Sequence, residues 1–494
     1  MTGPQTDVLV IGAGPVGLML AGELLLGGAR VVVAERLTEP TTESRASTLH
    51  ARTMEILDQR GLTGRLGEVP GDGTGHFGGI PLRLDGQQSP YAGLWKVPQS
   101  RVEEILGAWA IGLGAEVRRG RELTGLREDG AVVEAELSCE DGTRELLRAR
   151  YVVGCDGENS TVRRLAGFEF AGSAASRELI RADVAGIDVP NRRFERLPGG
   201  LAIAARRPDG ITRVMVHEFG RTATPRQAEP DFDEMARTWQ RVTGEDISHG
   251  TPVWINSFGD ASRQVTEYRR GRILLAGDAA HAQMPVGGQA LNLGLQDAFN
   301  LGWKLAAEIC GWAPPGLLDS YHEERHAVGS RVLSDIAAQA LLLLGGPEVE
   351  ALRSVVGRLL GLDAVRDHLA TGVGGIGIQY SAHEGDHPLL GARLPDAALD
   401  IEAGAATAWA LLRAGTGLLL DVAPEAPGHV DLRAVADGWA DRVRVVAARP
   451  RAGAVAPTTG AVLVRPDGHV VWADGGADRL RAALVQWFGS ADRT

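Results

Sequence analysis

The stretch DVLVIGAGPVGLMLAGELLLGGARVVVAER, residues 7–36, decides the fold of this chain. It predicts a buried strand over residues 8–11, a helix over residues 18–26, and a second strand over residues 31–33 that leads to Glu35. A strand, a glycine-rich turn, a helix and a second strand with a terminal acid form the order of a dinucleotide-binding unit. The sequence therefore predicts an α/β protein with a Rossmann-type domain at its N-terminus.

The glycines of this turn have separate tasks. Gly12 permits the tight turn, Gly14 lets a pyrophosphate approach the backbone, and Gly17 lets the helix pack closely on the strand. The helix N-terminus offers free N–H groups and a partial positive charge to the phosphate. Glu35 can accept hydrogen bonds from a ribose diol, which favours an adenosine ribose without a 2′-phosphate. Two further GxGxxG patterns, at residues 73–78 and 372–377, do not join a strand to a long helix and are interpreted as chance matches.

Composition limits the class of protein. A chain of 494 residues is too long for one core, so several domains are expected. Its net charge of −12 argues against nucleic-acid and anionic-membrane partners. Three distant cysteines without a CxxC motif fit a reducing cytoplasm. The apolar N-terminus lacks a basic leader, and the run AAQALLLLGG is expected to be too short to span a bilayer.

Two later stretches repeat the strand–turn–helix arrangement. ARYVVGCDGENSTVRRLAG predicts a strand that ends at Asp156 and Gly157, followed by a helix that Ser160 could cap. In GRILLAGDAAHAQMPVGGQALN, Asp278 follows a strand and a glycine-rich loop precedes a helix. Asp278 could bond the hydroxyls of a polyol chain. The helix start favours a ring that carries negative charge when reduced, as the pyrimidine end of a flavin does.

Together, GAGPVG, GCDG and GDAAHAQMPVGGQALNLGLQDAFNLGWKL resemble the single-component FAD-dependent aromatic hydroxylases, the family of para-hydroxybenzoate hydroxylase. The finer resemblance is to members that act on aromatic polyketides in angucycline and anthracycline pathways. It covers residues 5–345 and, in less detail, the rest of the chain. It implies FAD as cofactor, NADPH or NADH as a transient reductant, and O2 as co-substrate. One oxygen atom would pass through a peroxide at flavin C4a into a polycyclic, angucyclinone-like polyketide.

The resemblance implies two sets of cofactor contacts. The set at the pyrophosphate and adenosine comprises Gly12, Gly14, Pro15, Val16, Gly17, Glu35, Arg36 and Arg45. Asp156, with Gly157 beside it, belongs to the motif that serves both FAD and NADPH. Asp278 would bond the ribityl or phosphate region, and the remaining set, from the ribityl chain to the isoalloxazine, comprises Gln99, Pro285, Gly288, Gln289, Ala290, Leu291 and Asn292. Ala290 stands where the family usually has glycine. Because alanine disfavours positive φ, we expect a different loop geometry or flavin mobility there.

The resemblance also implies the domain organisation. An FAD-binding domain, residues 1–75, 98–175 and 265–345, is interleaved with a β-sheet substrate domain, residues 76–97 and 176–264. A helical connector, residues 346–390, leads to a thioredoxin-like domain without cysteines, residues 391–494. In that last domain RPDGHVVW predicts a hairpin that turns at Asp467 and Gly468.

Side chains that alternate along two predicted strands are candidates for the substrate pocket. They are Met215, His217, Trp254, Asn256 and Phe258. Ordinary sheet packing is the alternative for each of them. HEERH, residues 322–326, matches the zinc pattern HExxH, but no third ligand follows, so a helix surface without metal is expected.

Several reactions remain open at this point. Hydroxylation leads, and Baeyer–Villiger insertion or epoxidation would use the same cofactor. An FAD reductase without oxygen insertion and an accessory flavin-binding protein are more distant alternatives. The sequence identifies no protein acid or base. The expected partner is a small molecule, and homo-oligomers are possible.

Overall fold

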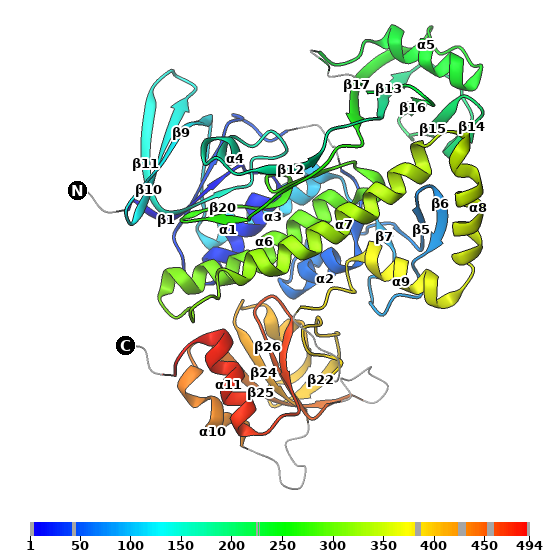
Figure 1. The fold of residues 1–494 in the computed structure, drawn as a ribbon. Coiled ribbons are helices and arrows are strands. Elements are labelled where there is room, and N and C mark those ends of the chain that lie inside the picture. Colours follow the sequence, from blue (N-terminus) through cyan, green and yellow to red (C-terminus); the bar gives the residue numbers. More distant parts are fainter. Residues whose placement is uncertain are drawn as a thin grey trace.

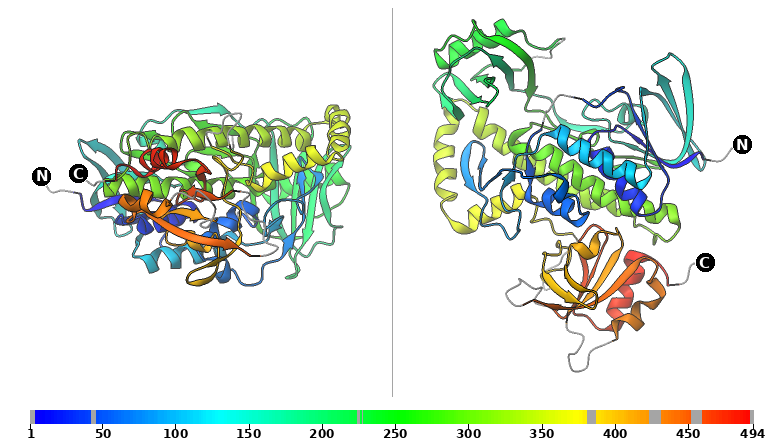
Figure 2. Two further views of the ribbon diagram at one scale, coloured as in Figure 1. Left: turned by 90° about the horizontal axis from the view of Figure 1, so that it is seen from below. Right: turned by 180° about the vertical axis from the view of Figure 1, so that it is seen from behind.

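The structure is a computed structural model that describes residues 4–41, 46–223, 226, 228–380, 387–422, 431–451 and 459–491. Figure 1 shows a central sheet with long helices beside it, a second sheet at one end, and a C-terminal domain against the helices. Figure 2 shows the same arrangement from below and from behind. Arg45 lies outside the described residues.

The central sheet has eight strands and a parallel core. Five neighbours, β20, β11, β1, β2 and β8, run parallel, whereas β19 and the hairpin of β9 and β10 pair antiparallel. The bounds are β1 Thr6–Ile11, β2 Val31–Glu35, β8 Glu116–Arg119, β9 Arg121–Asp129, β10 Val132–Cys139, β11 Arg144–Gly154, β19 Arg269–Arg270 and β20 Ile273–Leu275. Every residue of β1 is buried, as a central parallel strand requires. The expected α/β class with a Rossmann-type sheet is confirmed.

Small residues allow the helices on this sheet to approach closely. Helix α1 (Pro15–Leu26) packs on α3 (Gln99–Leu113) and on α6 (Gln289–Cys310). A Cβ on Gly22 would lie 2.1 Å from the Trp109 ring, so a side chain there would push α1 off α3. A Cβ on Gly302 would lie 2.3 Å from that of Glu23, which fixes the approach of α6 in the same way.

The second sheet is antiparallel, in the order β14, β15, β16, β13, β17. Its bounds are β13 Glu178–Ala185, β14 Arg192–Leu197, β15 Gly200–Arg206, β16 Thr212–Glu218 and β17 Thr251–Gly259, all within the expected middle domain. Helix α5 (Phe232–Thr243) covers one face with Met235 and Trp239. Asp231 caps its N-terminus, with the carboxylate 2.7 Å from the Glu234 N–H. The opposite face meets helix α7 and the loop that precedes α6.

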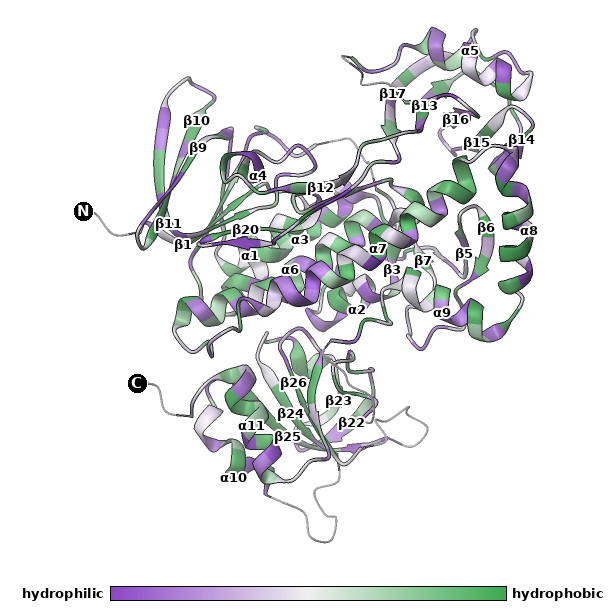
Figure 3. Cartoon of the chain, in the orientation of Figure 1, coloured by the Kyte–Doolittle hydropathy of each residue, from purple (hydrophilic) through white to green (hydrophobic). Residues whose placement is uncertain are grey.

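Helix α7 (Ser320–Leu344) crosses the molecule and touches all three parts. Its C-terminal end is strongly hydrophobic, as Figure 3 shows. Within the described residues it is the one helix that could span a membrane by length and composition, although half of its most apolar window is buried in the protein. The apolar run that was expected to be too short to span a bilayer forms only the C-terminal part of this helix. Helices α8 (Glu350–Leu359) and α9 (Asp363–Gly374) follow.

The C-terminal sheet has the order β23, β22, β25, β24, β26, β27. Strands β24 and β25 run parallel with α10 between them, and the β26–β27 hairpin and helix α11 follow, which is the thioredoxin-like arrangement. The bounds are β22 Ala398–Ile401, β23 Gly404–Thr407, β24 Gly417–Asp421, α10 Leu432–Ala436, β25 Val443–Pro450, β26 Ala461–Val464, β27 Val470–Ala473 and α11 Ala477–Phe488. The predicted hairpin is confirmed, with Gly468 at φ +79° in its turn.

Shorter elements complete the chain. They are β3 Leu49–His50, α2 Ala51–Gln59, β4 Gly71–Asp72, β5 Thr74–Phe77, β6 Ile80–Arg83, β7 Leu94–Trp95, α4 Thr161–Leu165, β12 Phe170–Ser173, β18 Ser262–Val265 and β21 His281–Gln283.

Candidate active site

The turn between β1 and α1 leaves open space at one glycine only. Gly12 has φ +106°, and a Cβ there would lie 2.5 Å from the Cys155 carbonyl oxygen. A Cβ on Gly17 would lie 2.0 Å from the Gly12 carbonyl oxygen. A Cβ on Gly14 would meet nothing within 4 Å. The turn is therefore closed on both sides and open over Gly14, at the N-terminus of α1, where a phosphate fits.

The carboxylate of Glu35 folds back onto this turn. It accepts hydrogen bonds from the Ala13 N–H at 2.7 Å and from the Leu37 N–H at 2.9 Å. The side chain of Glu35 is half-buried and the neighbouring Arg36 is exposed. The acid thus stands at the end of β2, beside the open turn, with its position fixed by the backbone.

The second predicted motif lies directly against the first, since the backbone of Cys155 and Asp156 contacts Gly12. The Asp156 carboxylate accepts from Ser160 Oγ at 2.6 Å and from the Thr161 N–H at 2.7 Å. Ser160 in turn caps α4, as predicted. The side chain of Asp156 therefore binds the start of α4, and Gly157, at φ +77°, turns the chain into it.

The third motif lies on the other side of the turn. The side chain of Val16 fits against Gly277 and Gly294, whose added Cβ atoms would lie 3.0 and 2.7 Å from it. Pro15, the first residue of α1, is buried, whereas Asp278 and Pro285 are exposed. The fold thus brings together three motifs that are far apart in the sequence.

The loop before α6 is held by two side chains. Gly287 and Gly288 have φ +67° and +72°, and the helix begins at Gln289. Asn292 accepts the His50 N–H at 2.8 Å and donates to the Gly288 carbonyl at 2.7 Å. His50 Nε2 lies 2.8 Å from the Gly287 carbonyl oxygen, and burial lowers its pKa to about 4. The neutral imidazole therefore donates to that carbonyl.

Ala290 does not disturb this loop. It lies in the first turn of α6, next to the half-buried Leu291, and among the described residues positive φ outside glycine occurs only at Phe194 and Asp474. A helical backbone suits alanine, so Ala290 needs no positive φ in this conformation, and an altered flavin mobility stays a prediction.

Comparison with known proteins decides the family. Residues 5–335 match the family model described as an FAD binding domain, and residues 387–491 match the aromatic-ring hydroxylase C-terminal domain. The chain belongs to the FAD-dependent aromatic-ring hydroxylases. Relatives in this family are named as monooxygenases, and the resemblance inferred from the motifs is confirmed.

Three similar proteins illustrate the range of this family. A rifampicin monooxygenase of Streptomyces venezuelae is 43% identical over 98% of this chain and 99% of its own length. The structure of CabE, an aromatic hydroxylase from angucycline biosynthesis, superimposes with a TM-score of 0.93 at 47% identity, over 99% of this chain and all of that one. A dialkyldecalin synthase of Streptomyces rugosporus is 39% identical over 98% of this chain and 99% of its own length.

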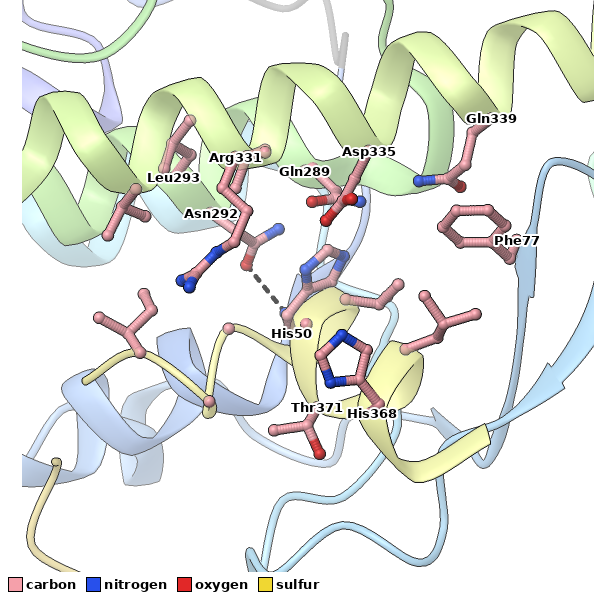
Figure 4. Close-up of a pocket in the computed structure, with 18 of the residues that line it drawn as sticks. His50, Phe77, Gln289, Asn292, Leu293, Arg331, Asp335, Gln339, His368 and Thr371 are labelled. Atoms are coloured by element: carbon pink, nitrogen blue, oxygen red, sulfur yellow. Dashed lines mark hydrogen bonds between the residues drawn. The ribbon is translucent and has the colours of Figure 1, made fainter. Parts of the chain in front are cut away.

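The protein has a cavity of about 500 Å³ beside the first turn of α6. Figure 4 shows it between α6 and α7 on one side and His50 and α9 on the other. Its volume lies in the range of small-molecule sites, about 300–1,000 Å³. Residues of α6 that line it are Gln289, Asn292, Leu293 and Gln296; α7 contributes Val328, Arg331, Val332, Asp335 and Gln339; Phe77, His368 and Ile378 complete much of the wall.

The five predicted pocket residues lie elsewhere. All five are on the sheet face opposite α5, but none lines this cavity. Met215 and Phe258 pack against Met284 and Val286 of the loop before α6. The alternation along the strands was therefore a reliable guide to the shared face, on which His217 is buried and Trp254 and Asn256 are half-buried.

Polar side chains on this face are occupied by neighbours. His217 Nδ1 lies 2.8 Å from the Glu178 carbonyl oxygen and its Nε2 lies 3.1 Å from that of Leu344, while burial lowers its pKa. Arg181 donates to Asn256 Oδ1 at 3.1 Å and stacks over Trp254 at 4.7 Å.

Two other predicted groups have local partners. Gln99 donates to Glu103 Oε1 at 2.8 Å, at the start of α3. His322 and His326 lie with ring centroids 5.0 Å apart around Tyr268. Among the described residues, no group of three His, Cys, Asp or Glu side chains is placed to hold a metal ion.

The cavity residues of α7 escaped the sequence-based interpretation, although the sequence carried a signal for them. Arg331, Asp335 and Gln339 recur every fourth residue in the apolar run RVLSDIAAQALLLL. A spacing of four places side chains on one face of a helix. A polar row on an otherwise apolar helix indicates a face that meets something other than a hydrophobic core.

Proposed function

We propose that this hydroxylase is an FAD-dependent, NAD(P)H-consuming monooxygenase that inserts one oxygen atom of O2 into a polycyclic aromatic polyketide of the angucyclinone class. The observation that carries the proposal is the cavity beside the first turn of α6, because that turn follows the glycine loop expected at the redox end of the flavin. When bound, FAD supplies the hydride acceptor and the dioxygen chemistry that side chains lack.

The protein would contribute position and exclusion of water. Gly12, Gly14 and Gly17 would hold the pyrophosphate at α1, and the N–H groups at the start of α6 would face the flavin's pyrimidine end. Asn292 and His50 fix the loop from behind. The apolar side chains of the cavity wall, such as Phe77, Leu293 and Val332, would orient a flat ring system toward that end. No acid or base of the chain is needed for this role.

Gly14→Val tests cofactor binding separately from folding. Because a Cβ at Gly14 meets nothing and its φ of −73° suits valine, the variant is expected to melt within a few degrees of wild type when both are stripped of flavin. Its side chain would occupy the space over the turn, so FAD affinity should fall at least about 100-fold, the loss expected when a phosphate cradle is filled. Retained FAD would contradict this assignment of the turn.

The dependence of flavin reduction on bound substrate tests the reaction class. The flavin-loaded enzyme is mixed with NADPH, and in parallel with NADH, without oxygen, and the visible flavin band is followed with and without an angular tetracyclic quinone. We expect the band to bleach much faster when the quinone is present. A band that never bleaches would contradict an NAD(P)H-consuming monooxygenase.

Product analysis separates the possible outcomes after reduction. Under labelled dioxygen, hydroxylation adds one labelled oxygen to a ring carbon, whereas Baeyer–Villiger insertion places it within an expanded ring. The 39% identical dialkyldecalin synthase motivates the remaining alternative, a flavin-bound protein that transfers no oxygen. An unlabelled product would favour that alternative.

A further inference from the structure

One wall of the cavity carries a buried donor without a partner. The Gln339 side chain is fully buried, and its Oε1 accepts a long hydrogen bond of 3.4 Å from the Gly78 N–H. Its Nε2 has no hydrogen-bond partner within the described part of the chain. Figure 4 shows this amide pointing into the cavity, between Phe77 and Asp335. Buried donors are rarely left unpaired, and this one, unlike the unpartnered amide of Gln59, lines a cavity, so it indicates an acceptor atom that the ligand would supply.

An acceptor stands one helical turn away. Asp335 precedes Gln339 by four residues on α7, which separates their Cβ atoms by about 6 Å on the same face. Its side chain is half-buried and lines the same cavity. Burial raises the pKa of Asp335, and the nearby Arg331 and His368 offset part of that rise. The carboxyl group can accept a hydrogen bond from a ligand hydroxyl.

This pair lies near the flavin end of the site. Gln339 Oε1 would be 4.0 Å from a Cβ placed on Gly287, in the loop before α6. The remaining wall mixes apolar side chains, such as Phe77, Leu293 and Val332, with polar ones, among them His50, Gln289 and His368. A flat ring system would lie against these apolar side chains, with one polar edge against α7 and the ring within reach of the first turn of α6.

We propose that Gln339 and Asp335 form a donor–acceptor pair that recognises a hydroxyl group beside a ketone or quinone carbonyl on the edge of the substrate. The Gln339 amide donates to the carbonyl oxygen, and the Asp335 carboxyl accepts from the neighbouring hydroxyl. This inference rests on the proposed function, because it specifies the polar edge that the polycyclic substrate must present. It assigns Gln339 and Asp335 a role in positioning the ring, not in the chemical step.

Binding of three related probes to the FAD-loaded enzyme, without NADPH, tests the pair by calorimetry. The probes are a benz[a]anthraquinone with one hydroxyl beside a quinone carbonyl, the parent quinone, and the parent hydrocarbon. Each buried hydrogen bond is expected to contribute about 10-fold in affinity. Wild type should therefore bind the hydroxyquinone about 10-fold tighter than the quinone, and the quinone about 10-fold tighter than the hydrocarbon.

Two variants should each remove one of these preferences. Gln339→Met keeps the length of the side chain without the donor, so the preference for quinone over hydrocarbon should disappear. Asp335→Leu keeps the branched shape without the acceptor, so only the preference for the hydroxyl should disappear. Gln59→Met is the matched control, since Gln59 is a fully buried glutamine without side-chain partners in the described chain and lies outside the cavity. Melting curves check that every variant is folded.

The outcomes separate this inference from the proposed function. Loss of the two preferences in their respective variants supports the pair. If wild type and both folded variants rank the probes alike, the proposed donor–acceptor pair is rejected. The proposed monooxygenase reaction is then still tested separately by the incorporation of labelled oxygen. If wild type with FAD bound takes up none of the probes, the substrate class fails and the inference fails with it.

Discussion

The two ends of helix α7 bury polar side chains in opposite ways. At the N-terminal end, Glu324 accepts from Arg465 at 2.5 and 2.9 Å and from Lys304 at 2.8 Å, so its charge is fully paired. At the C-terminal end, Gln339 keeps a donor without a partner beside a cavity. Paired polar groups hold parts of a protein together, whereas an unpaired donor at the wall of a cavity can be completed by a ligand. One helix thus serves assembly at one end and recognition at the other.

The paired end, which we call the ionic interface, joins α6 and α7 to the β26–β27 hairpin of the C-terminal domain. It comprises Asn300, Lys304, Glu324, Arg465 and Asp467. Burial alone would raise the pKa of Glu324, but Arg465 and Lys304 outweigh it and lower that pKa to about 2. Arg52 and Arg60 of the first domain add hydrogen bonds to hairpin carbonyls at 3.0 and 2.9 Å.

The largest expected effect comes from breaking the ionic interface. Arg465→Met leaves Glu324 and Asp467 buried with fewer partners, so the free energy of unfolding should fall by about 3–5 kcal/mol. Urea unfolding followed by fluorescence measures this. Arg451→Met removes an exposed ion pair with Asp400 and should cost at most about 1 kcal/mol. Equal losses in the two variants would contradict the special role of the interface.

Acid should lower the free energy of unfolding through histidines near both ends of α7. Burial lowers the pKa of His469, at the interface, and of His50, at the cavity, from 6.5 to about 4. The unfolded state therefore binds more protons between these values, and stability is lost as the pH falls from about 6.5 to 4. Each histidine accounts for on the order of 3 kcal/mol of this loss.

Glutamine substitutions assign the acid sensitivity to each end. His469→Gln and His50→Gln should each flatten the curve of unfolding free energy against pH between pH 7 and 4, measured by urea unfolding. Glu324 acts at lower pH, because its depressed pKa keeps its contribution until the pH falls below about 4.5. A curve that stays as steep in both histidine variants would contradict burial of the neutral rings.

The smallest effect on stability is expected at the unpaired end. Gln339→Met replaces an unpartnered buried amide with a side chain of similar length, so the free energy of unfolding should change by less than about 1 kcal/mol without ligand. The same urea measurement applies. A loss as large as that of Arg465→Met would show that Gln339 holds the fold, and the contrast between the ends of α7 would disappear.

The sequence predicts features that depend on local backbone geometry. The turn at Gly12, the loop at Gly288 and the hairpin at Gly468 all have positive φ, and their neighbours identify a strand or helix on each side. The cap of Ser160 on α4 likewise depends only on residues close to it in the sequence. The fold class and the family could be predicted from these features.

Features assembled from distant segments are harder to predict. The cavity combines His50, Phe77, Gln339 and His368, and no periodicity joins them. The strand alternation that suggested the five pocket residues identifies a face of the sheet but not what covers that face. Arg331, Asp335 and Gln339 are the exception, since their spacing of four can be seen in the sequence. The sequence does not show which residues face them across the cavity.

The most direct test of the central claim is the mass of the product formed from an angular hydroxyquinone by the FAD-loaded enzyme, NADPH and labelled dioxygen. We expect a product that carries one labelled oxygen atom and that forms more slowly with Asp335→Leu and Gln339→Met, while Gln59→Met behaves as wild type. A converted substrate that carries no label, whether it gained no oxygen or gained one from water, would contradict this reaction.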